Sequence, residues 1–507
     1  MPRVDYRMEI ETEPGSWLPI GDDLHGPTPV IVERGLVPGA PVAVPGTLTF
    51  ALLDAQGRYT PGDPEQLAGF RVGAPVRLRA ASRGTFAGLF LGRITRIRPG
   101  DGVTQVAAAD AMGALERTTL GTFPLTFDAV PRDLVNVLVD RGFIAPEAAV
   151  FWQLDLVARL GTDTQLADTF TGKAFDEGQS VFPFVGDMWG PDWSLRRALQ
   201  EVVASEGGQF FIAADGTPTF HDRHHRPARV GPDLTIDVGL TALEADWSAA
   251  GLANQVAITL YPREVGTGEV RLWQAATVLR LEPGVERALS ARYTGEGDLR
   301  WIGALDVRAA IEVRTRRDPD KGKVATGDVT LELEAGASAA RIRLFNRRDQ
   351  VLYVHTLRLF GLPLRAFNPV TIAVADVDAQ VATGRHPLRL DLRLLSDPAV
   401  AADRALGLLQ RLADPQPRLT VEMEATVSNR GLLLGIGAEI NQRLAISDPR
   451  LGPAPVGVFV DRIRHVITAL GASHRVTWWT SPADPVTYWL LGEAGLGELG
   501  QMTRVGY

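Results

Sequence analysis

The sequence predicts a mainly β fold with a few helices. Over most of the 507 residues, apolar and polar side chains alternate with a period of two, and turn residues interrupt the pattern at short intervals. This pattern is typical of antiparallel strands joined by hairpins. Only three segments show helical periodicity, and long strand-rich stretches separate them, which argues against a regular βαβ alternation. Because the chain is too long for one hydrophobic core, we expect three or four domains.

The clearest strands lie in the N-terminal part of the chain. Their predicted ranges are 45–60, 70–81, 86–98 and 102–110. Within 86–98 the apolar positions drift out of phase with the arginines, which predicts a β-bulge. These strands predict a first β-barrel over residues 1–120.

Three segments have helical signals, at 131–142, 192–207 and 397–415. Asp192 and Asp397 are the predicted N-caps, and glycine or proline ends each segment. The second segment is followed by a strand pair at 210–220, whose Asp-Gly turn favours a hairpin. The first two helices and this hairpin predict a small α+β domain over residues 121–232.

The most informative feature is a weak internal repeat. Three pairs of segments match in order: Phe70–Leu78 with Leu434–Ile440, Leu89–Ile97 with Val458–Val466, and Val103–Ala108 with His474–Trp479. Each copy is expected to be a strand, a long hairpin, a second strand, a turn and a third strand. The alternative is chance, since any two antiparallel meanders look somewhat alike.

If the repeat is real, the chain carries a second β-barrel that an insertion interrupts. The strand at 254–260 has no nearby partner, and we expect it to pair with residues 417–480. The predicted parts are a second barrel from 233–262 and 416–485, an inserted β-rich, sandwich-like domain at 263–415, and a C-terminal docking tail at 486–507.

Composition and charge exclude several classes of protein. The chain has no cysteine, which excludes disulfide frameworks, thiolate metal sites and cysteine nucleophiles. The net charge of −8 argues against a protein that grips nucleic acid, because such proteins neutralise phosphates with a basic surface. A surface that DNA slides past would be neutral or mildly acidic. No secretory signal or membrane-spanning run occurs, so we expect a soluble protein made in a cytoplasm.

Candidate chemical sites are few. Residues 221–225 hold three histidines, but the segment follows a strand and precedes Pro227, so we interpret it as a surface loop in preference to a metal site. His221 and His225 could meet only if the segment were helical. Gly435 and Gly437 are interpreted as a hairpin turn.

Pairs of acidic residues at period-two spacing are interpreted as solvated or lumen-facing strand faces, and not as glycosidase carboxylates. These pairs are Glu9 and Glu11, Glu332 and Glu334, and Glu422 and Glu424. Nucleophile elbows, Walker loops and H-E-x-x-H motifs do not occur. We therefore expect a protein that is not an enzyme and that uses no cofactor and no metal.

Several motifs resemble those of phage tail-tip, or baseplate hub, proteins. Residues 52–62, LLDAQGRYTPG, resemble the L-D-N-x-D-G-R-Y-T-P segment of that family, with Ala55 in place of Asn. The family's following G-x-x-V-R-L and F-x-G-x-I segments resemble 73–78 and 90–94, and its D-x-x-G-x-L resembles 110–115. The stretch 206–216 with Arg223, and the end of the chain from Tyr488 to Tyr507, resemble further family motifs. The likeness touches about 60% of the chain and rests on the order of short structural motifs.

The resemblance implies a structural role in the virion. Such hub proteins are homotrimers in which each subunit supplies two tail-tube-like barrels, so that three chains match a hexameric tube. It implies contact with the tail tube or distal tail protein above, a spike, fibre or tip protein below, and the tape-measure protein in the lumen. DNA would pass through without sequence-specific binding during genome ejection.

Four residues are the candidate contacts with another chain: Trp479, Trp489, Leu490 and Leu491. Trp479 alternates with Trp478 on the last strand, and the other three lie in a Gly-rich tail. Three other functions stay open. They are a peptidoglycan-directed hydrolase, a carbohydrate- or receptor-binding protein, with 263–415 as the host domain, and a hexameric distal tail protein.

Overall fold

The computed structural model describes residues 5–82, 85–120, 123, 125–126, 128–143, 173–190, 192–229, 231–294, 301–468 and 471–483. It confirms the mainly β fold, with 46% of the residues in strands and 18% in helices. Three hydrophobic cores organise it. No helix in these ranges combines the length and apolarity needed to cross a bilayer.

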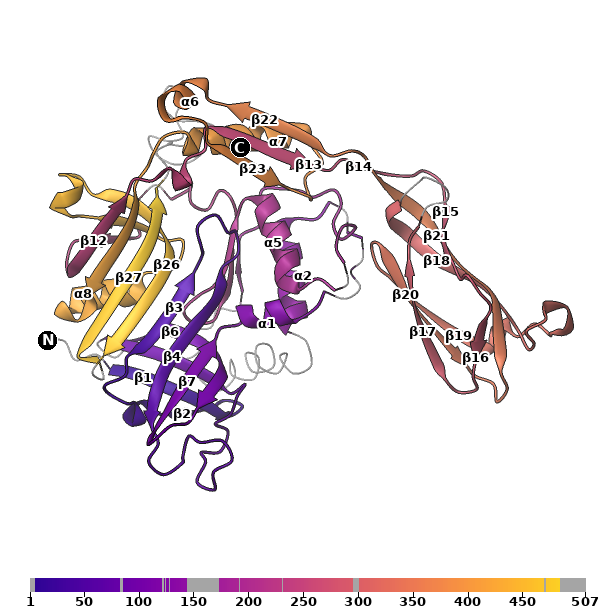
Figure 1. Cartoon of the computed structure of the whole chain (residues 1–507), viewed down its shortest axis with the longest axis horizontal. Coiled ribbons are helices and arrows are strands. Elements are labelled where there is room, and N and C mark those ends of the chain that lie inside the picture. The colour runs from indigo at the N-terminus through magenta and orange to yellow at the C-terminus, as the bar shows by residue number, and fades with distance from the viewer. Residues whose placement is uncertain are drawn as a thin grey trace.

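One large sheet unites the first and the last of the described strands (Figure 1). Its central path runs β12-β24-β27-β26-β3-β4-β7-β6-β5-β1-β2, with β25 beside β26 and β11 beside β25. The strands are β1 Asp5–Glu13, β2 Ser16–Pro19, β3 Val30–Gly35, β4 Val44–Leu53, β5 Pro75–Ser82, β6 Thr85–Arg98, β7 Val103–Ala109, β11 Leu234–Ile236, β12 Leu240–Asp246, β24 Arg418–Glu424, β25 Arg443–Ile446, β26 Val456–Thr468 and β27 Ser473–Pro482.

The sheet consists of two modules. The N-module holds β1 to β7, and the C-module holds β11, β12 and β24 to β27. Four strands of each follow the same spatial order, β4-β7-β6-β5 in one and β24-β27-β26-β25 in the other. The path through the described strands is open, with β2 and β12 at its ends. Closure of each module into a barrel stays a prediction.

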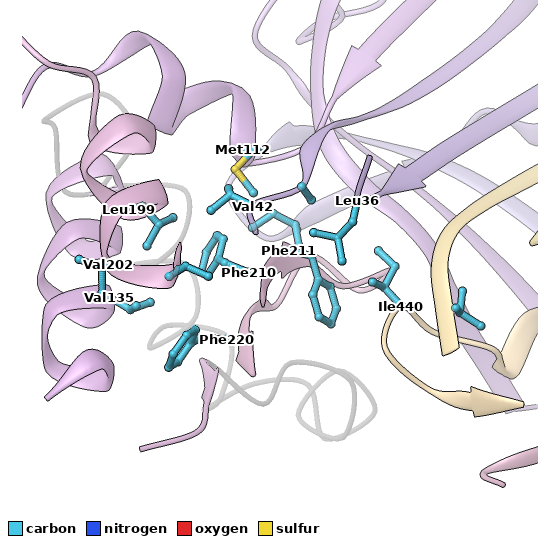
Figure 2. Close-up of a cluster of buried hydrophobic side chains, with 14 of the residues drawn as sticks. Leu36, Val42, Met112, Val135, Leu199, Val202, Phe210, Phe211, Phe220 and Ile440 are labelled. Atoms are coloured by element: carbon cyan, nitrogen blue, oxygen red, sulfur yellow. The ribbon is translucent and has the colours of Figure 1, made fainter. Parts of the chain in front are cut away.

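A small α+β unit packs between the modules. It holds α1 Met112–Arg117, α2 Pro131–Phe143, α5 Leu195–Glu206, β8 Ala174–Phe175, β9 Gln209–Ile212 and β10 Pro218–His221. The predicted hairpin is confirmed, since β9 and β10 pair antiparallel. The predicted N-cap Asp192 is wrong: the Ser194 side chain accepts a hydrogen bond from the Arg197 amide. In Figure 2, Phe210 faces the helices while Phe211 points toward Leu36 and Ile440 of the two modules.

The strand at 255–260 does not pair with residues 417–480. As β13, Gln255–Leu260, it pairs with β22, Val370–Ala375, and with β23, Pro387–Asp391. Helix α7, Pro398–Leu412, contacts β13 and β22, and α6, Val377–Thr383, follows β22. The predicted bounds 233–262 and 263–415 therefore shift, because strand partners are set by tertiary packing and not by sequence order. Asp397 does cap α7 as predicted, accepting from the Ala399 amide.

The insertion proper is a pair of sheets over residues 263–366 with its own core. The five-stranded sheet holds β14 Arg263–Val265, β15 Val270–Gln274, β16 Leu279–Leu281, β18 Trp301–Arg314 and β21 Leu352–Ala366, and the three-stranded sheet holds β17 Glu286–Arg292, β19 Val329–Ala335 and β20 Ala339–Asn346. This unit projects away from the large sheet (Figure 1).

The motif at 52–62 forms a turn organised by one carboxylate. Asp54 accepts hydrogen bonds from the Tyr59 amide and the Thr60 hydroxyl, both at 2.8 Å, and from the Thr104 hydroxyl at 2.6 Å. Burial alone would raise the pKa of Asp54, but these bonds lower it below its usual value. The turn places the buried ring of Tyr59 edge-on to Phe70, 5.1 Å away.

Replacing Asp54 should therefore loosen the N-module. We expect Asp54→Ala to leave the buried Thr104 hydroxyl without its acceptor and to cost roughly 2–3 kcal/mol, which is about a 30- to 160-fold loss of amide exchange protection in β4 and β7. Hydrogen-exchange mass spectrometry measures this loss. Asp101→Ala, at an exposed turn between β6 and β7, is the matched control. Equal protection in both variants would contradict the role given to Asp54.

Candidate assembly interface

The two modules match at a β-bulge. Strand β6 is bulged against β7 between Ile94 and Arg96, and β26 is bulged against β27 between Val460 and Arg462. Aligning the bulges places residues 94–98, ITRIR, on residues 460–464, VDRIR. The predicted bulge in 86–98 is thereby confirmed.

Backbone hydrogen bonds beside the bulges support this alignment. The Gly73 amide donates to the Ile94 carbonyl at 2.7 Å, and the Asn441 amide donates to the Val460 carbonyl at 2.8 Å. In return, the Ile94 amide donates to the Ala74 carbonyl at 2.8 Å, and the Val460 amide donates to the Gln442 carbonyl at 3.0 Å. Gly73 and Asn441 both have positive φ, 88° and 72°, a conformation that Gly and Asn tolerate best. The repeat is therefore present in the backbone, in a register that differs from the predicted sequence matches.

The alignment corrects all three predicted pairs of segments. Ile94 lies on Val460, three residues away from the predicted match of Leu89–Ile97 with Val458–Val466. Ala107 lies on Trp479, one residue away from the predicted match of Val103–Ala108 with His474–Trp479. Residues 434–440 are not a strand, because α8, Asn429–Gly437, extends to Gly437 and the Ser428 side chain caps it by accepting from the Gly431 amide. The strand equivalent to β5 is β25, at 443–446. The predicted hairpin turn at Gly435 and Gly437 is likewise wrong.

The modules join edge to edge within the chain. Strand β3 pairs antiparallel with residues 462–467 of β26, with Glu33 opposite Arg464. The Glu33 carboxylate forms an ion pair with Arg462 and lies 3.8 Å from Arg464. The next residue, Arg34, is buried and donates to Glu439 at 2.9 Å. We call the pairing of β3 with β26 the intrachain joint.

A buried chain of polar rings lies beneath the intrachain joint. His465 Nδ1 lies 3.0 Å from His474 Nε2, and His474 Nδ1 lies 2.8 Å from the Tyr6 hydroxyl. Burial lowers the pKa of His474 to about 4, against the opposing charge of Glu424. Burial, with the charges of His474 and Arg34, lowers the pKa of His465 well below its usual value. Both imidazoles are therefore neutral at pH 7.

Trp478 lies in the hydrophobic core, whereas Trp479 lies beside the intrachain joint. Trp478 is fully buried, whereas Trp479 is half-buried with the Arg462 guanidinium 4.9 Å from its ring centre. Trp479 thus lies beside the intrachain joint, and its contact with another subunit stays a prediction. Trp489, Leu490 and Leu491 lie outside the described residues.

The histidine cluster adopts a geometry that the sequence did not suggest. His221 and His225 stack with ring centres 3.3 Å apart although residues 223–228 form turns, so the expectation that only a helix could bring them together is wrong. His225 Nδ1 lies 2.9 Å from Asp176. Within the described ranges, no group of three or more His, Cys, Asp or Glu side chains is arranged to hold a metal ion.

The acid pairs have different environments. Glu332 and Glu334 are exposed. Glu9 and Glu11 are buried, contrary to the predicted solvated face, and Glu9 bonds to Arg77 and Arg79, each at 2.7 Å. The expectation failed because the arginines come from β5, a strand far from β1 in sequence.

The neutral histidines predict acid sensitivity of the joint. Their folded pKa values lie below the unfolded value of about 6.5, so their contribution to stability is complete above that pH and falls as pH drops toward about 4. For His474 alone we expect the free energy of unfolding to decrease by about 2 kcal/mol between pH 7 and pH 5. His474→Gln should flatten this pH dependence in chemical denaturation, whereas Tyr6→Phe, which keeps both histidines, should retain it. An unchanged slope in His474→Gln would refute this assignment.

No protein-family model and no curated protein matches the chain. Its structure is similar to three solved tail proteins. The tail protein from Neisseria meningitidis MC58 is 11% identical and has a TM-score of 0.47, with 94% of this chain and 96% of that one covered. The 43 kDa tail protein of prophage MuSo2 from Shewanella oneidensis is 10% identical, with a TM-score of 0.46 and coverage of 94% and 98%. Prophage tail protein gp18 from Listeria monocytogenes EGD-e is 8% identical, with a TM-score of 0.41 and coverage of 94% and 95%.

Proposed function

We propose that the protein is a structural subunit of a phage-type tail, the hub at the tail tip, and that it is not an enzyme. The observation that carries this proposal is the pair of sheet modules with one strand order, joined edge to edge through β3 and β26. The motifs at 52–62 and 73–78, which resemble hub proteins, lie in the turn and strand that organise the N-module.

A duplicated module suits a position where symmetry changes. Three chains with two modules each present six similar units, which can stack on a hexameric tube, while the ring as a whole keeps the threefold symmetry of a spike or fibre. Pairing of modules around a ring also covers sheet edges that would otherwise be exposed. On this reading the ring meets the tube or distal tail protein above and the spike or tip protein below.

The lumen of such a ring would hold the tape-measure protein and later pass DNA. The net charge of −8 suits passage without adhesion, because phosphates are not attracted to an acidic surface. The protein would act in the virion tail. The sandwich at 263–366 projects from the large sheet and has its own core (Figure 1), so a receptor- or glycan-binding role there is compatible with a structural role of the modules.

The oligomeric state tests the proposal. We expect the purified full chain to show a native mass of three times its 54.8 kDa, and class averages from electron microscopy to show a threefold ring with six similar lobes. A stable monomer, or a sixfold ring of six chains, would contradict the hub. Hydrolysis of peptidoglycan by the purified chain would contradict the absence of enzyme activity.

A further inference from the structure

We propose that β12 of one copy pairs with the outer edge of β6 in a neighbouring copy, and that this contact repeats between chains the intrachain joint of β3 with β26. The inference rests on the proposed trimer and names the surfaces that would form it. One side is residues 245–248, which we call the donor edge. The other is residues 96–99, which we call the acceptor edge.

The donor edge is the C-module's equivalent of β3. Strand β3 pairs with β4 on one side and β26 on the other, whereas β12 pairs with β24 alone within the described residues. Sheet register fixes the correspondence, because Thr49 and Thr420 hold equivalent places opposite β7 and β27. Thr47 and Arg418 lie two positions before these threonines. The residue opposite Thr47 is Glu33 of β3, and the residue opposite Arg418 is Asp246 of β12.

The side chains of the donor edge are more exposed than the equivalent side chains of β3. In β3, Val32 and Arg34 are covered, with 1% and 3% of their surface exposed. Their equivalents in the C-module are Ala245, which is exposed, and Trp247, which is 67% exposed. An exposed tryptophan at the end of an open edge strand is typical of a contact surface. A partner placed as β26 is placed on β3 would cover it.

The acceptor edge is the N-module's equivalent of residues 462–465 of β26, which pair with β3. The equivalents of 466 and 467 belong to the turn between β6 and β7. Strand β5 covers β6 only as far as Arg93, and β7 lies along the opposite edge of β6. Residues 96, 98 and 99 are exposed, and in the described part of the chain no strand pairs with them on the side away from β7. Transferring the register of the intrachain joint puts Arg98 opposite Asp246 and Ile97 opposite Trp247.

The charges of the two edges are complementary in the same way. In the intrachain joint, Glu33 lies between Arg462 and Arg464. The bulge alignment makes Arg96 and Arg98 their equivalents, and neither has an ion-pair partner among the described residues. Among the residues that the structure describes, the Asp246 carboxylate forms no ion pair and accepts one side-chain hydrogen bond, from the Ser248 hydroxyl at 3.1 Å. One acid facing two arginines would therefore recur between chains.

The donor edge and the acceptor edge of one chain cannot pair with each other. They stand seven strand positions apart along the sheet, at about 4.8 Å per strand. Each chain thus presents one donor and one acceptor edge, which makes the contact heterologous. Such a contact forms a ring when the rotation between neighbouring copies closes. A second copy of this chain is the occupant that the register, the charges and the exposed tryptophan jointly specify.

Cysteine cross-linking tests the contact, because the natural chain has no cysteine. Directly opposed residues in antiparallel strands have Cα atoms about 4.5–5.5 Å apart, within disulfide range. We expect Asp246→Cys/Arg98→Cys to shift under oxidation from the mass of one chain to that of three on a non-reducing gel. The matched control is Glu33→Cys/Arg464→Cys, across the intrachain joint, which should cross-link without any change of mass.

The outcomes separate this inference from the proposed function. A trimer by native mass that gives no interchain disulfide, while the control pair does cross-link, would overturn the contact and leave the hub intact. A monomer would overturn both. Cross-linked species that extend beyond three chains would support the contact and contradict the closed trimer.

Charge reversal provides a second test that needs no disulfide. Arg98→Glu should shift the native mass toward the monomer, and adding Asp246→Arg should restore the trimer. Trp247→Ala should also weaken the trimer, whereas Trp273→Ala, in the sandwich and away from both edges, should not. Full trimer in Arg98→Glu and Trp247→Ala alike would refute the contact.

Discussion

The pairing of β3 with β26 is the constraint on which the rest of the structure depends. It joins residues 30–35 to residues 462–467, so a strand early in the described sequence and one near its end become neighbours in one sheet. Arg34, His465 and His474 are buried close to the joint, and their bonds to Glu439, to each other and to Tyr6 order the adjoining ends of both modules. Since contacts so distant in sequence carry a large loop-closure cost, the joint should form late in folding, after each module has its local hairpins.

The units between the modules are held by buried and partly buried arginines. Arg226, after the β9–β10 hairpin, donates to Asp461 of the C-module at 2.7 Å and to Ser481 at 2.8 Å. Arg404 of α7 is buried against carbonyl groups at the C-terminal end of α5, where a cation is favoured by the helix dipole. Arg263 and Asp187, both fully buried, lie 2.8 Å apart where the sandwich begins. Losing one partner of such a pair leaves a buried charge, which is strongly destabilising, so these arginines favour one fixed arrangement of the units.

Local patterns in the sequence predicted local structure well and partners poorly. The Asp397 cap, the hairpin at 210–220 and the bulge in β6 each depend on residues within a few positions of one another, and all three are confirmed. The partner of β13 and the burial of Glu9 depend on strands far away in the chain, and no periodicity reports them. The strand prediction for residues 434–440 failed for a third reason. An apolar run with glycines suits a strand, but the Ser428 cap starts a helix that continues through this run to Gly437.

The repeat has diverged least where module meets module. Equivalent positions differ freely in the cores, as Val106 and Trp478 do, yet the sequence Arg-Ile-Arg is kept in β6 and β26 and an acid is kept in β3 and β12. In the intrachain joint, a Cβ at Gly35 would collide with the Asp461 carbonyl oxygen, so a glycine is required there. Covalent linkage removes most of the entropic cost of association, so this joint needs no large apolar side chain at its end. A contact between chains has to meet that cost in full. The exposed Trp247, at the place of Arg34, supplies the larger apolar surface that such a contact would need.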